Sequence, residues 1–144
     1  MNSKDELKIF IGMSRVLNEI NRKTGKIFSK YNLTNSQFAV LEVLYHKGDL
    51  TIGEVKEKIL STSGTIPVIV RNLERDGYLQ RKRDKDDKRK YILHITEKGR
   101  DLMDKVYPEN EKMIISLMDN WDESDKKEII YYMKKFGGNN EKTN

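Results

Sequence analysis

The sequence of 144 residues contains no cysteine, and this absence excludes several kinds of chemistry. Without a thiol, the chain forms no disulfide and offers no thiolate nucleophile, sulfur ligand for zinc or thiol redox sensor. It has only two prolines and 8% aromatic residues, which suits a mostly helical chain. No stretch approaches the roughly 20 apolar residues of a membrane span, and the N-terminus lacks a secretion signal. We therefore expect a cytoplasmic protein.

Charged residues, in contrast, make up 35% of the chain, and its length suits one domain with a real core. The net charge of +5 is spread unevenly. The segment YLQRKRDKDDKRKY, residues 78–91, contains seven Lys or Arg and three Asp, and so carries +4 of that excess. A local excess of this kind indicates contact with a polyanion. A solvated charged loop remains the alternative.

Two capping boxes predict helix starts in the middle of the chain. Thr34 and Gln37 precede a helix that ends near Gly48, and Thr51 and Glu54 precede a short helix of about two turns. Apolar residues recur at helical spacing in both segments. They are Phe38, Leu41, Leu44, Tyr45, Ile52, Val55 and Ile59.

The next segment, SGTIPVIVRNLERDG, predicts a third helix, although its start contains glycine and proline, which disfavour a helix interior. Its apolar residues fall on one face until Gly77 ends the helix. They are Ile66, Ile69, Val70 and Leu73. Three short helices, of which the last two are joined by a tight polar turn, predict a helix-turn-helix.

The segments YLQRKRD and RKYILHIT, separated by the charged KDDK, predict a β-hairpin. A helix then starts at Thr96 and Glu97, and Pro108 must kink or interrupt it. A last helix is expected from about Asp122. Residues 137–144, GGNNEKTN, contain no core residue, and we expect a disordered tail there.

The terminal helices carry more apolar surface than a helix-turn-helix and a hairpin can cover. We infer that these helices pack against each other and against a second copy of the chain. A single, larger monomeric core is the alternative. The apolar positions of the N-terminal stripe are Leu7, Phe10, Met13, Val16, Leu17, Ile20, Ile27, Phe28 and Tyr31.

The sequence offers no pattern of a catalytic or metal site, so we expect neither enzymatic activity nor a cofactor. The two histidines, His46 and His94, lie apart and have no nearby carboxylate pattern of a metal site or triad. The segment DKDDKRKYILHI has a superficial likeness to a calcium loop. Its sixth position is Arg89 instead of glycine, and its twelfth is Ile95 instead of glutamate.

From LTNSQFAVLEVLYHKG through SGTIPVIVRNLERDGYLQ to KDDKRKYILHITEKGRDL, about 70 residues in order, the chain resembles the MarR family of bacterial transcription regulators. The segments EVLYHKG and SGTIPVIV resemble most its branch that responds to quinones and electrophiles. The resemblance implies a mainly α fold with a small β-hairpin wing in a single domain, 1–144. Residues 34–96 would form the winged helix-turn-helix core, and residues 5–31 and 97–136 the dimerisation helices.

The family assigns the third helix to the major groove, where the first turns approach the bases. Gly64 would let the backbone approach a phosphate, and Pro67 and Val68 would contact a thymine methyl. The helix-breaking residues are then tolerated because this start faces DNA, although a poor helix start is the alternative. The expected recognition residues are Ser63, Gly64, Thr65, Pro67, Val68 and Arg71.

In the wing, Asp87 is expected to pair with Arg89 and shape the hairpin tip, while Arg89 and Lys88 enter the minor groove. The remaining cations are expected to contact phosphates, which position the protein without reading sequence. They are Arg81, Arg83, Lys85 and Lys90.

The resemblance implies a ligand-responsive repressor that binds a pseudo-palindromic operator as a homodimer. The alternative is a helical protein-interaction module without specific DNA binding. Members of the family respond to small aromatic or phenolic compounds, and six residues are candidates for lining such a pocket, although each serves equally well in an ordinary core. They are Phe10, Met13, Leu17, Leu44, Tyr45 and His46.

Overall fold

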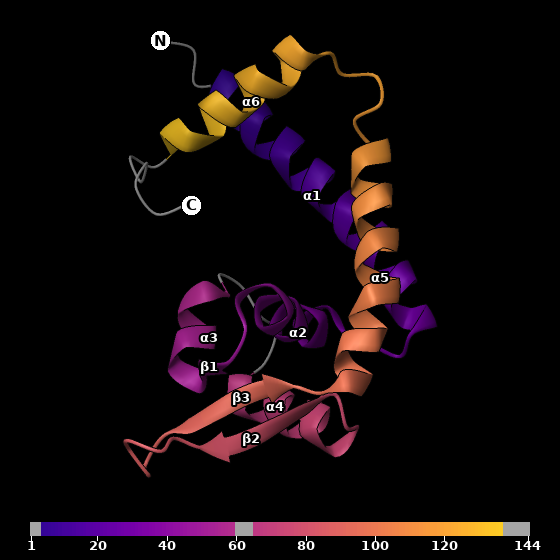
Figure 1. Ribbon diagram of the computed structural model, residues 1–144. Coiled ribbons are helices and arrows are strands. Elements are labelled where there is room, and N and C mark those ends of the chain that lie inside the picture. Colours follow the sequence, from indigo (N-terminus) through magenta and orange to yellow (C-terminus); the bar gives the residue numbers. More distant parts are fainter. Residues whose placement is uncertain (1–3, 60–64, 137–144) are drawn as a thin grey trace. The chain divides into compact units, whose positions relative to one another are not determined.

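The computed structural model of the chain describes residues 4–59 and 65–136 (Figure 1). The expected recognition residues Ser63 and Gly64, and the tail from 137 to 144, lie outside the described residues. The chain divides into two compact units, residues 1–111 and 112–144, and each is described by itself. No helix in the described part of the chain is both long and apolar enough to cross a membrane.

The first unit contains five helices, counting the beginning of α5, and three short strands in its described part. In chain order, the elements are α1 (Lys4–Lys30), α2 (Asn35–Lys47), β1 (Leu50–Thr51), α3 (Ile52–Lys58), α4 (Ile66–Arg75), β2 (Leu79–Arg83), β3 (Tyr91–Ile95) and α5 (Glu97–Ser116). The mainly α fold with a β-hairpin wing that the sequence predicts is confirmed. Figure 1 shows the β2–β3 hairpin extending beyond the helices of this unit.

Both predicted capping boxes of the first unit are present. The Thr34 side chain accepts from the Gln37 N–H at 3.1 Å, and the Gln37 side chain accepts from the Thr34 N–H at 3.0 Å. Thr51 and Glu54 make the same reciprocal pair at 3.1 and 3.2 Å. These bonds satisfy N–H groups that the first turn of a helix leaves without an intrahelical partner, so each helix begins where its box predicts.

The helix ends predicted at glycine are also present. Gly48 and Gly77 follow α2 and α4 with φ of +84° in both cases, a conformation that side chains with a Cβ rarely adopt. At the end of α4, the N–H of Tyr78 donates to the Leu73 carbonyl at 2.9 Å, and the N–H of Gly77 to that of Glu74 at 3.0 Å. This pair of bonds turns the chain from α4 directly into β2.

The hairpin belongs to a three-stranded antiparallel sheet in the order β1-β3-β2. β2 and β3 are the expected strands, and Leu79 pairs with Ile95 at the base of the hairpin. β1 was not expected from the sequence: its two residues pair with β3, Leu50 opposite Leu93. By pairing with β3, the short strand β1 joins the beginning of α3 to the base of the wing.

The core of the first unit forms around α2. Val40, Leu41 and Leu44 are fully buried, and Phe28 from α1 stacks on Phe38 with ring centroids 4.2 Å apart. Burial of side chains of this size contributes about 1.5–3 kcal/mol each to folding. The other fully buried side chains come from the elements around α2: Val55, Val70, Leu73, Leu79, Leu93, Met103 and Val106.

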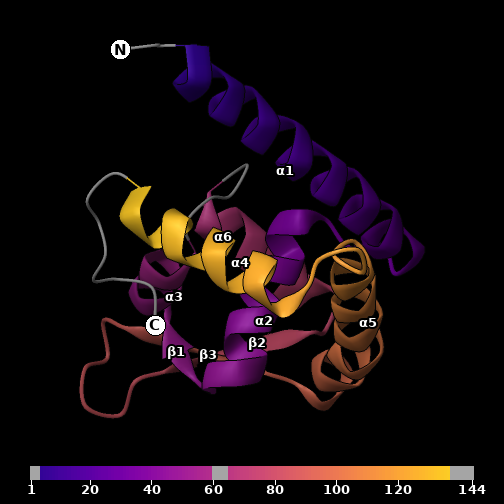
Figure 2. The ribbon, with the colours of Figure 1, turned by 90° about the horizontal axis from the view of Figure 1, so that it is seen from above.

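α1 is well packed only at its C-terminal end. Ile27 and Phe28 are its buried residues, whereas Phe10 near the other end is 66% exposed. Figures 1 and 2 both show α1 as one straight helix that runs away from α2 toward its N-terminal end. Of the stripe that the sequence predicts to be uncovered, the part from Leu7 to Leu17 is exposed, whereas Ile27 and Phe28 are buried within the first unit.

α5 continues through Pro108 without interruption. Of the two outcomes that the proline allowed, an interrupted helix is thus wrong. Close to the proline, the buried Asn110 accepts a hydrogen bond from the Thr24 hydroxyl of α1 at 3.2 Å. Glu109 accepts from the Tyr31 hydroxyl at 2.6 Å and pairs with Lys30, so the end of α1 is tied to this turn.

The second unit consists of the end of α5 and of α6 (Glu123–Lys135). α6 starts where expected, because Asp122 forms a capping box with Asp125. None of the α6 residues is buried. Its exposed large apolar side chains are Ile129, Ile130, Tyr131, Tyr132 and Met133, followed by Phe136 just after the helix.

Candidate nucleic-acid interface

α4 has one buried and one exposed face. Ile66, Ile69, Val70 and Leu73 are buried against the core, as the sequence pattern predicts. The opposite face holds four exposed positions, of which the third lies three or four residues after the first two and four residues before the last. They are Pro67, Val68, Arg71 and Arg75.

The start of α4 lacks the side-chain cap with which three other helices begin. Thr65 is the N-cap residue but makes no side-chain cap hydrogen bond, whereas α2, α3 and α6 all begin with capping boxes. Pro67 occupies the first turn, where its missing N–H removes no helical hydrogen bond. The Val68 N–H donates to the Thr65 carbonyl at 3.1 Å within this turn. The positive end of the helix dipole favours an anion such as a phosphate at this exposed start.

The tip of the wing is shaped by Asp87. Its carboxylate accepts from the backbone N–H and the Nε–H of Arg89, both at 3.1 Å, and its carbonyl accepts from the Lys90 N–H at 3.0 Å. The expected Asp87–Arg89 pair is therefore confirmed. Asp87 has a lowered pKa because Arg89 hydrogen-bonds its charged form. The Arg89 side chain itself remains 89% exposed, so its outer guanidinium edge stays accessible.

The other predicted wing cations differ in their surroundings. Lys85, Lys88 and Lys90 are exposed, with no ion pair to any residue in the described ranges. Arg83 lies with its guanidinium 5.8 Å from the centre of the Tyr91 ring. Arg81 is instead bound to Glu74 of α4 by its backbone and its side chain, at 3.2 and 3.0 Å.

Sequence reasoning missed the junction between α4 and α5. The Thr96 hydroxyl donates to the Gly77 carbonyl at 2.6 Å and accepts from the Gly99 N–H at 3.1 Å. A Cβ at Gly99 would lie only 2.1 Å from the Tyr78 carbonyl oxygen. The signal was present in the sequence, because a glycine inside a helix often marks a close approach of backbone. Thr96 and Gly99 thus fix the end of the candidate recognition helix to the start of α5.

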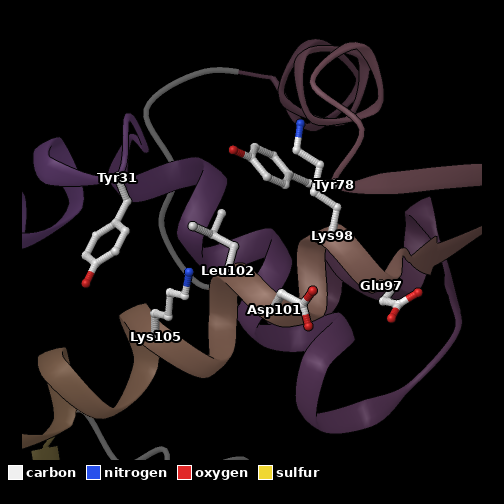
Figure 3. Close-up of a pocket in the computed structure, with 7 residues that line it drawn as sticks. All are labelled: Tyr31, Tyr78, Glu97, Lys98, Asp101, Leu102 and Lys105. Carbon is white, nitrogen blue, oxygen red and sulfur yellow. The ribbon is translucent and has the colours of Figure 1, made fainter.

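An open cavity of about 490 Å³ lies beside this junction (Figure 3). In Figure 3, the Lys98 side chain lies along the Tyr78 ring, and its Nζ donates to the Asp76 carbonyl at 2.7 Å. None of the six predicted pocket residues lines this cavity. Its walls come from Tyr31, Tyr78, Glu97, Lys98, Asp101, Leu102 and Lys105.

The six predicted pocket residues have different environments in the single chain. Phe10, Met13 and Leu17 are exposed on α1, and Leu44 is fully buried in the core. The two others have partners on α5. The Tyr45 hydroxyl bonds Asp104, and the His46 ring meets the Tyr107 ring edge-on with centroids 4.7 Å apart.

A half-buried carboxylate lies next to this aromatic contact. Burial raises the pKa of Glu42, while the nearby His46 acts in the opposite direction. Burial together with the charge of Glu111 also raises the pKa of Tyr107. The contact between α2 and α5 therefore contains a carboxylate whose charged form is poorly solvated.

Comparison with known proteins gives three kinds of match. A family model described as transcriptional regulator SarA/Rot matches residues 22–106. The HTH-type transcriptional regulator MhqR of Bacillus subtilis is 35% identical over 95% of this chain and 94% of its own length.

Solved structures with the same fold include a MarR family protein from Bacillus stearothermophilus, with a TM-score of 0.73 and 22% identity over 93% of this chain and 91% of that one. The MepR–DNA complex of Staphylococcus aureus has a TM-score of 0.77 and 22% identity, and the match covers 85% of this chain and 91% of that one. The organohalide-sensing regulator RdhR in its 2,4-dichlorophenol-bound form has a TM-score of 0.79 and 21% identity, and the match covers 90% of this chain and 78% of that one.

Proposed function

The chain belongs to the SarA/Rot and MarR-type winged-helix transcription regulators, and we propose that it is a ligand-responsive repressor that acts as a cytoplasmic homodimer. As a member it is a DNA-binding transcription regulator. The proposal covers the repressor action, the dimer, the compartment, the effector and the roles of single residues.

One observation carries the proposal for the reading surface: α4 exposes an uncapped start beside a positively charged hairpin. Thr65, Val68 and Arg71 lie on the open face of α4, and Arg71 has no ion pair or hydrogen bond to any side chain in the described ranges. We assign base contacts in the major groove to this face, together with Ser63, Gly64 and Pro67. The accessible Arg89, with Lys88, enters the minor groove, and Arg83, Lys85 and Lys90 contact phosphates.

The proposed dimer is supported by the exposed apolar residues of α1 and α6, which a second copy would cover. Light scattering at micromolar concentration is expected to give twice the chain mass of 17.0 kDa. A monomer under these conditions would contradict recognition of a two-fold site.

Operator geometry provides the test of the function. Two α4 helices related by a two-fold axis enter successive major grooves, so half-site centres should lie roughly 10 to 10.5 base pairs apart, or a multiple of this spacing. Fragments of genomic DNA selected by the protein would identify the operator. Insertion of about five base pairs between the half-sites turns one of them to the far side of the duplex and should abolish tight binding. Equal affinity for the two duplexes would overturn the proposal and favour an interaction module without specific DNA binding.

We assign the effector to the class of small aromatic or phenolic compounds. Support comes from the fold shared with RdhR, whose structure holds 2,4-dichlorophenol. Phe10, Met13 and Leu17 would line the site together with Tyr45 and His46 once a second copy covers them, and Leu44 would form its floor. Titration with 2,4-dichlorophenol and with a quinone, each followed by gel shift on the selected operator, tests this assignment. Since the chain has no thiol, a thiol reductant should not reverse any effect.

A further inference from the structure

Arg81 differs from the other cations of the wing because it is held by a carboxylate of α4. Its Nη2 lies 3.0 Å from Glu74 Oε1, and its Nε lies 3.2 and 3.3 Å from the two carboxylate oxygens. The backbone N–H of Arg81 donates to the same carboxylate at 3.2 Å. Hydrogen bonds from Arg81 lower the pKa of Glu74, which is therefore charged at neutral pH.

The strand register explains why Arg81 faces α4. Residues directly opposite in an antiparallel pair share one face of a sheet, and Arg81 lies opposite the fully buried Leu93. Two residues earlier, Leu79 occupies the same face and is buried as well. Arg81 thus extends the core-facing row of β2, and its guanidinium lies 5.6 Å from the centre of the Tyr91 ring.

The position of Glu74 on α4 makes this contact relevant to DNA recognition. Glu74 comes three residues after Arg71, so the two side chains are neighbours on the helix surface, at a spacing that suits an i,i+3 ion pair. Arg81 engages both oxygens of Glu74 instead. Arg71 is left without an ion pair to any residue in the described ranges.

We propose that Arg81 is a positioning residue and not a phosphate contact: its pair with Glu74 holds α4 against the wing and keeps Arg71 free for DNA. The inference rests on the proposed role of the exposed face of α4 as the reading surface. A surface ion pair of this kind contributes little to folding stability. Its effect is on specificity, because a planar guanidinium bound to both carboxylate oxygens fixes distance and direction.

The substitution Glu74→Gln separates the two roles by the sign of its effect. If Arg81 were a phosphate contact shielded by Glu74, the variant would lose an anion near DNA, and binding to every duplex would become tighter. A positioning pair predicts the reverse on the operator. Affinity for the duplex selected by the wild-type protein should fall about tenfold, as for one mismatched base pair, while affinity for a random duplex of equal length stays equal or rises.

Arg81→Lys adds an independent measurement, because it keeps the charge and loses the planar fork. We expect about the same tenfold loss on the selected duplex, with an unchanged dependence of affinity on salt. In a double-mutant cycle with Glu74→Gln and Arg81→Gln, the double variant should discriminate between the duplexes no worse than either single variant.

Two control variants match these changes. Asp101→Asn also removes one negative charge, but from an exposed position of α5, and should leave the ratio of the two affinities unchanged. Arg83→Gln removes a cation from the same face of β2 that contacts the same Tyr91 ring and has no carboxylate partner in the described ranges. It should weaken binding to both duplexes and lower the salt slope by roughly 0.9 for each phosphate that is no longer neutralised.

The inference is overturned if Glu74→Gln tightens binding to the selected duplex, or if Arg81→Lys binds it like the wild type. Thermal unfolding of each variant shows that the fold is retained, and little change is expected because both side chains are about one third exposed. Failure of the proposed function gives a different result: the wild-type protein itself would not distinguish the selected duplex from the random one.

Discussion

The helix-turn-helix with its wing and the helix α6 are built in opposite ways. We call the helix-turn-helix with its wing, residues 34–106, the head. Every helix of the head buries at least one side chain in its described part, and the fully buried side chains include Val40, Leu41, Leu44 and Leu73. In α6 no residue is buried, although the helix has a capping box of the same kind. Capping boxes thus begin α2 and α3 of the head as well as α6, and the burial of side chains is what distinguishes the two regions.

This difference in burial bears on the proposed dimer. The head hides its apolar surface by itself, whereas α6 exposes Ile130 and Met133 at 51% and 60%. Most helical stability in proteins comes from packing of an apolar face, so the exposed apolar residues of α6 support the proposed dimer. Substitutions in the two regions should consequently change different measurements.

The largest effect is expected from polar substitutions in α6. Ile130→Glu combined with Met133→Glu places charges on the face that a second copy would cover and should give a chain of monomer mass by light scattering. Operator affinity should fall roughly 10²- to 10⁴-fold, because a dimer that binds two half-sites at once gains about this factor in affinity over a monomer that binds one. Lys134→Glu introduces the same side chain at an exposed polar position and serves as control. A dimer that persists in the double variant would place the association elsewhere.

The second effect is loss of stability in the head. Gly99→Ala forces a Cβ to within 2.1 Å of the Tyr78 carbonyl oxygen, and overpacking of this kind costs about 1–3 kcal/mol. The free energy of unfolding in urea should fall by this amount. Gly12→Ala is the matched control, because nothing lies within 4 Å of a Cβ there. That control should be neutral or gain up to about 1 kcal/mol, since alanine favours a helix over glycine.

An effect of similar or smaller size concerns base reading by α4. Arg71→Ala should cost about 1 to 3 kcal/mol on the operator and relax preference at one position per half-site, if Arg71 contacts a base with both nitrogens. Neither the dimer mass nor the unfolding curve should change. Repeating the selection of bound duplexes with the variant measures the preference. An unaltered consensus would remove Arg71 from the reading residues.

The wing cations should give smaller and distinguishable effects. Lys85→Ala should weaken binding to operator and random DNA alike. The slope of log affinity against log salt concentration should become smaller by roughly 0.9 for each phosphate that the variant leaves unneutralised, and so by about two in a dimer. Arg89→Ala should instead lose most affinity on operators with A·T-rich flanks, where the minor groove is narrow. Affinities over a salt series distinguish these outcomes, and wild-type behaviour of Arg89→Ala on every duplex would contradict the assigned wing contact.

The smallest effect tests the packing of the head itself. Burial raises the pKa of Glu42, so the folded state binds this proton more tightly than the unfolded state does. The stability associated with this protonation is present below the unfolded pKa and is lost as pH rises through the folded pKa. Glu42→Gln should therefore raise the unfolding temperature slightly at neutral pH and not at acidic pH. The same gain at both pH values would mean that burial of the charge is not its cause.

Much of the fold could be predicted because its signals are local. Thr34 with Gln37 and Thr51 with Glu54 lie three residues apart, and Gly77 needs only its own φ to end α4. The strand β1 had no such signal. It has two residues, and Leu50 becomes a strand residue only by pairing with Leu93, far along the chain. Strand pairing at this separation depends on the tertiary fold.

In the candidate site, local features were predictable and the pairing between distant residues was not. The net charge of the wing and the Asp87–Arg89 pair could be predicted, since the latter joins residues two apart on a hairpin tip. Arg81 could not be told from Lys85, because both are cations of one segment. Only the register of β2 on β3 turns Arg81 toward Glu74.

The junction at Thr96 also predicts how the head opens in solution. The Tyr78 N–H donates to the Leu73 carbonyl, and the Thr96 N–H donates to the Tyr78 carbonyl at 3.1 Å. The first bond closes the end of α4, and the second joins Tyr78 to the residue that precedes α5. We therefore expect these amide protons to exchange with solvent only when the two elements open together. Residues between secondary-structure elements usually exchange fast. Here Tyr78 and Thr96 should rank among the slowly exchanging amides, at rates close to those of fully buried Leu73.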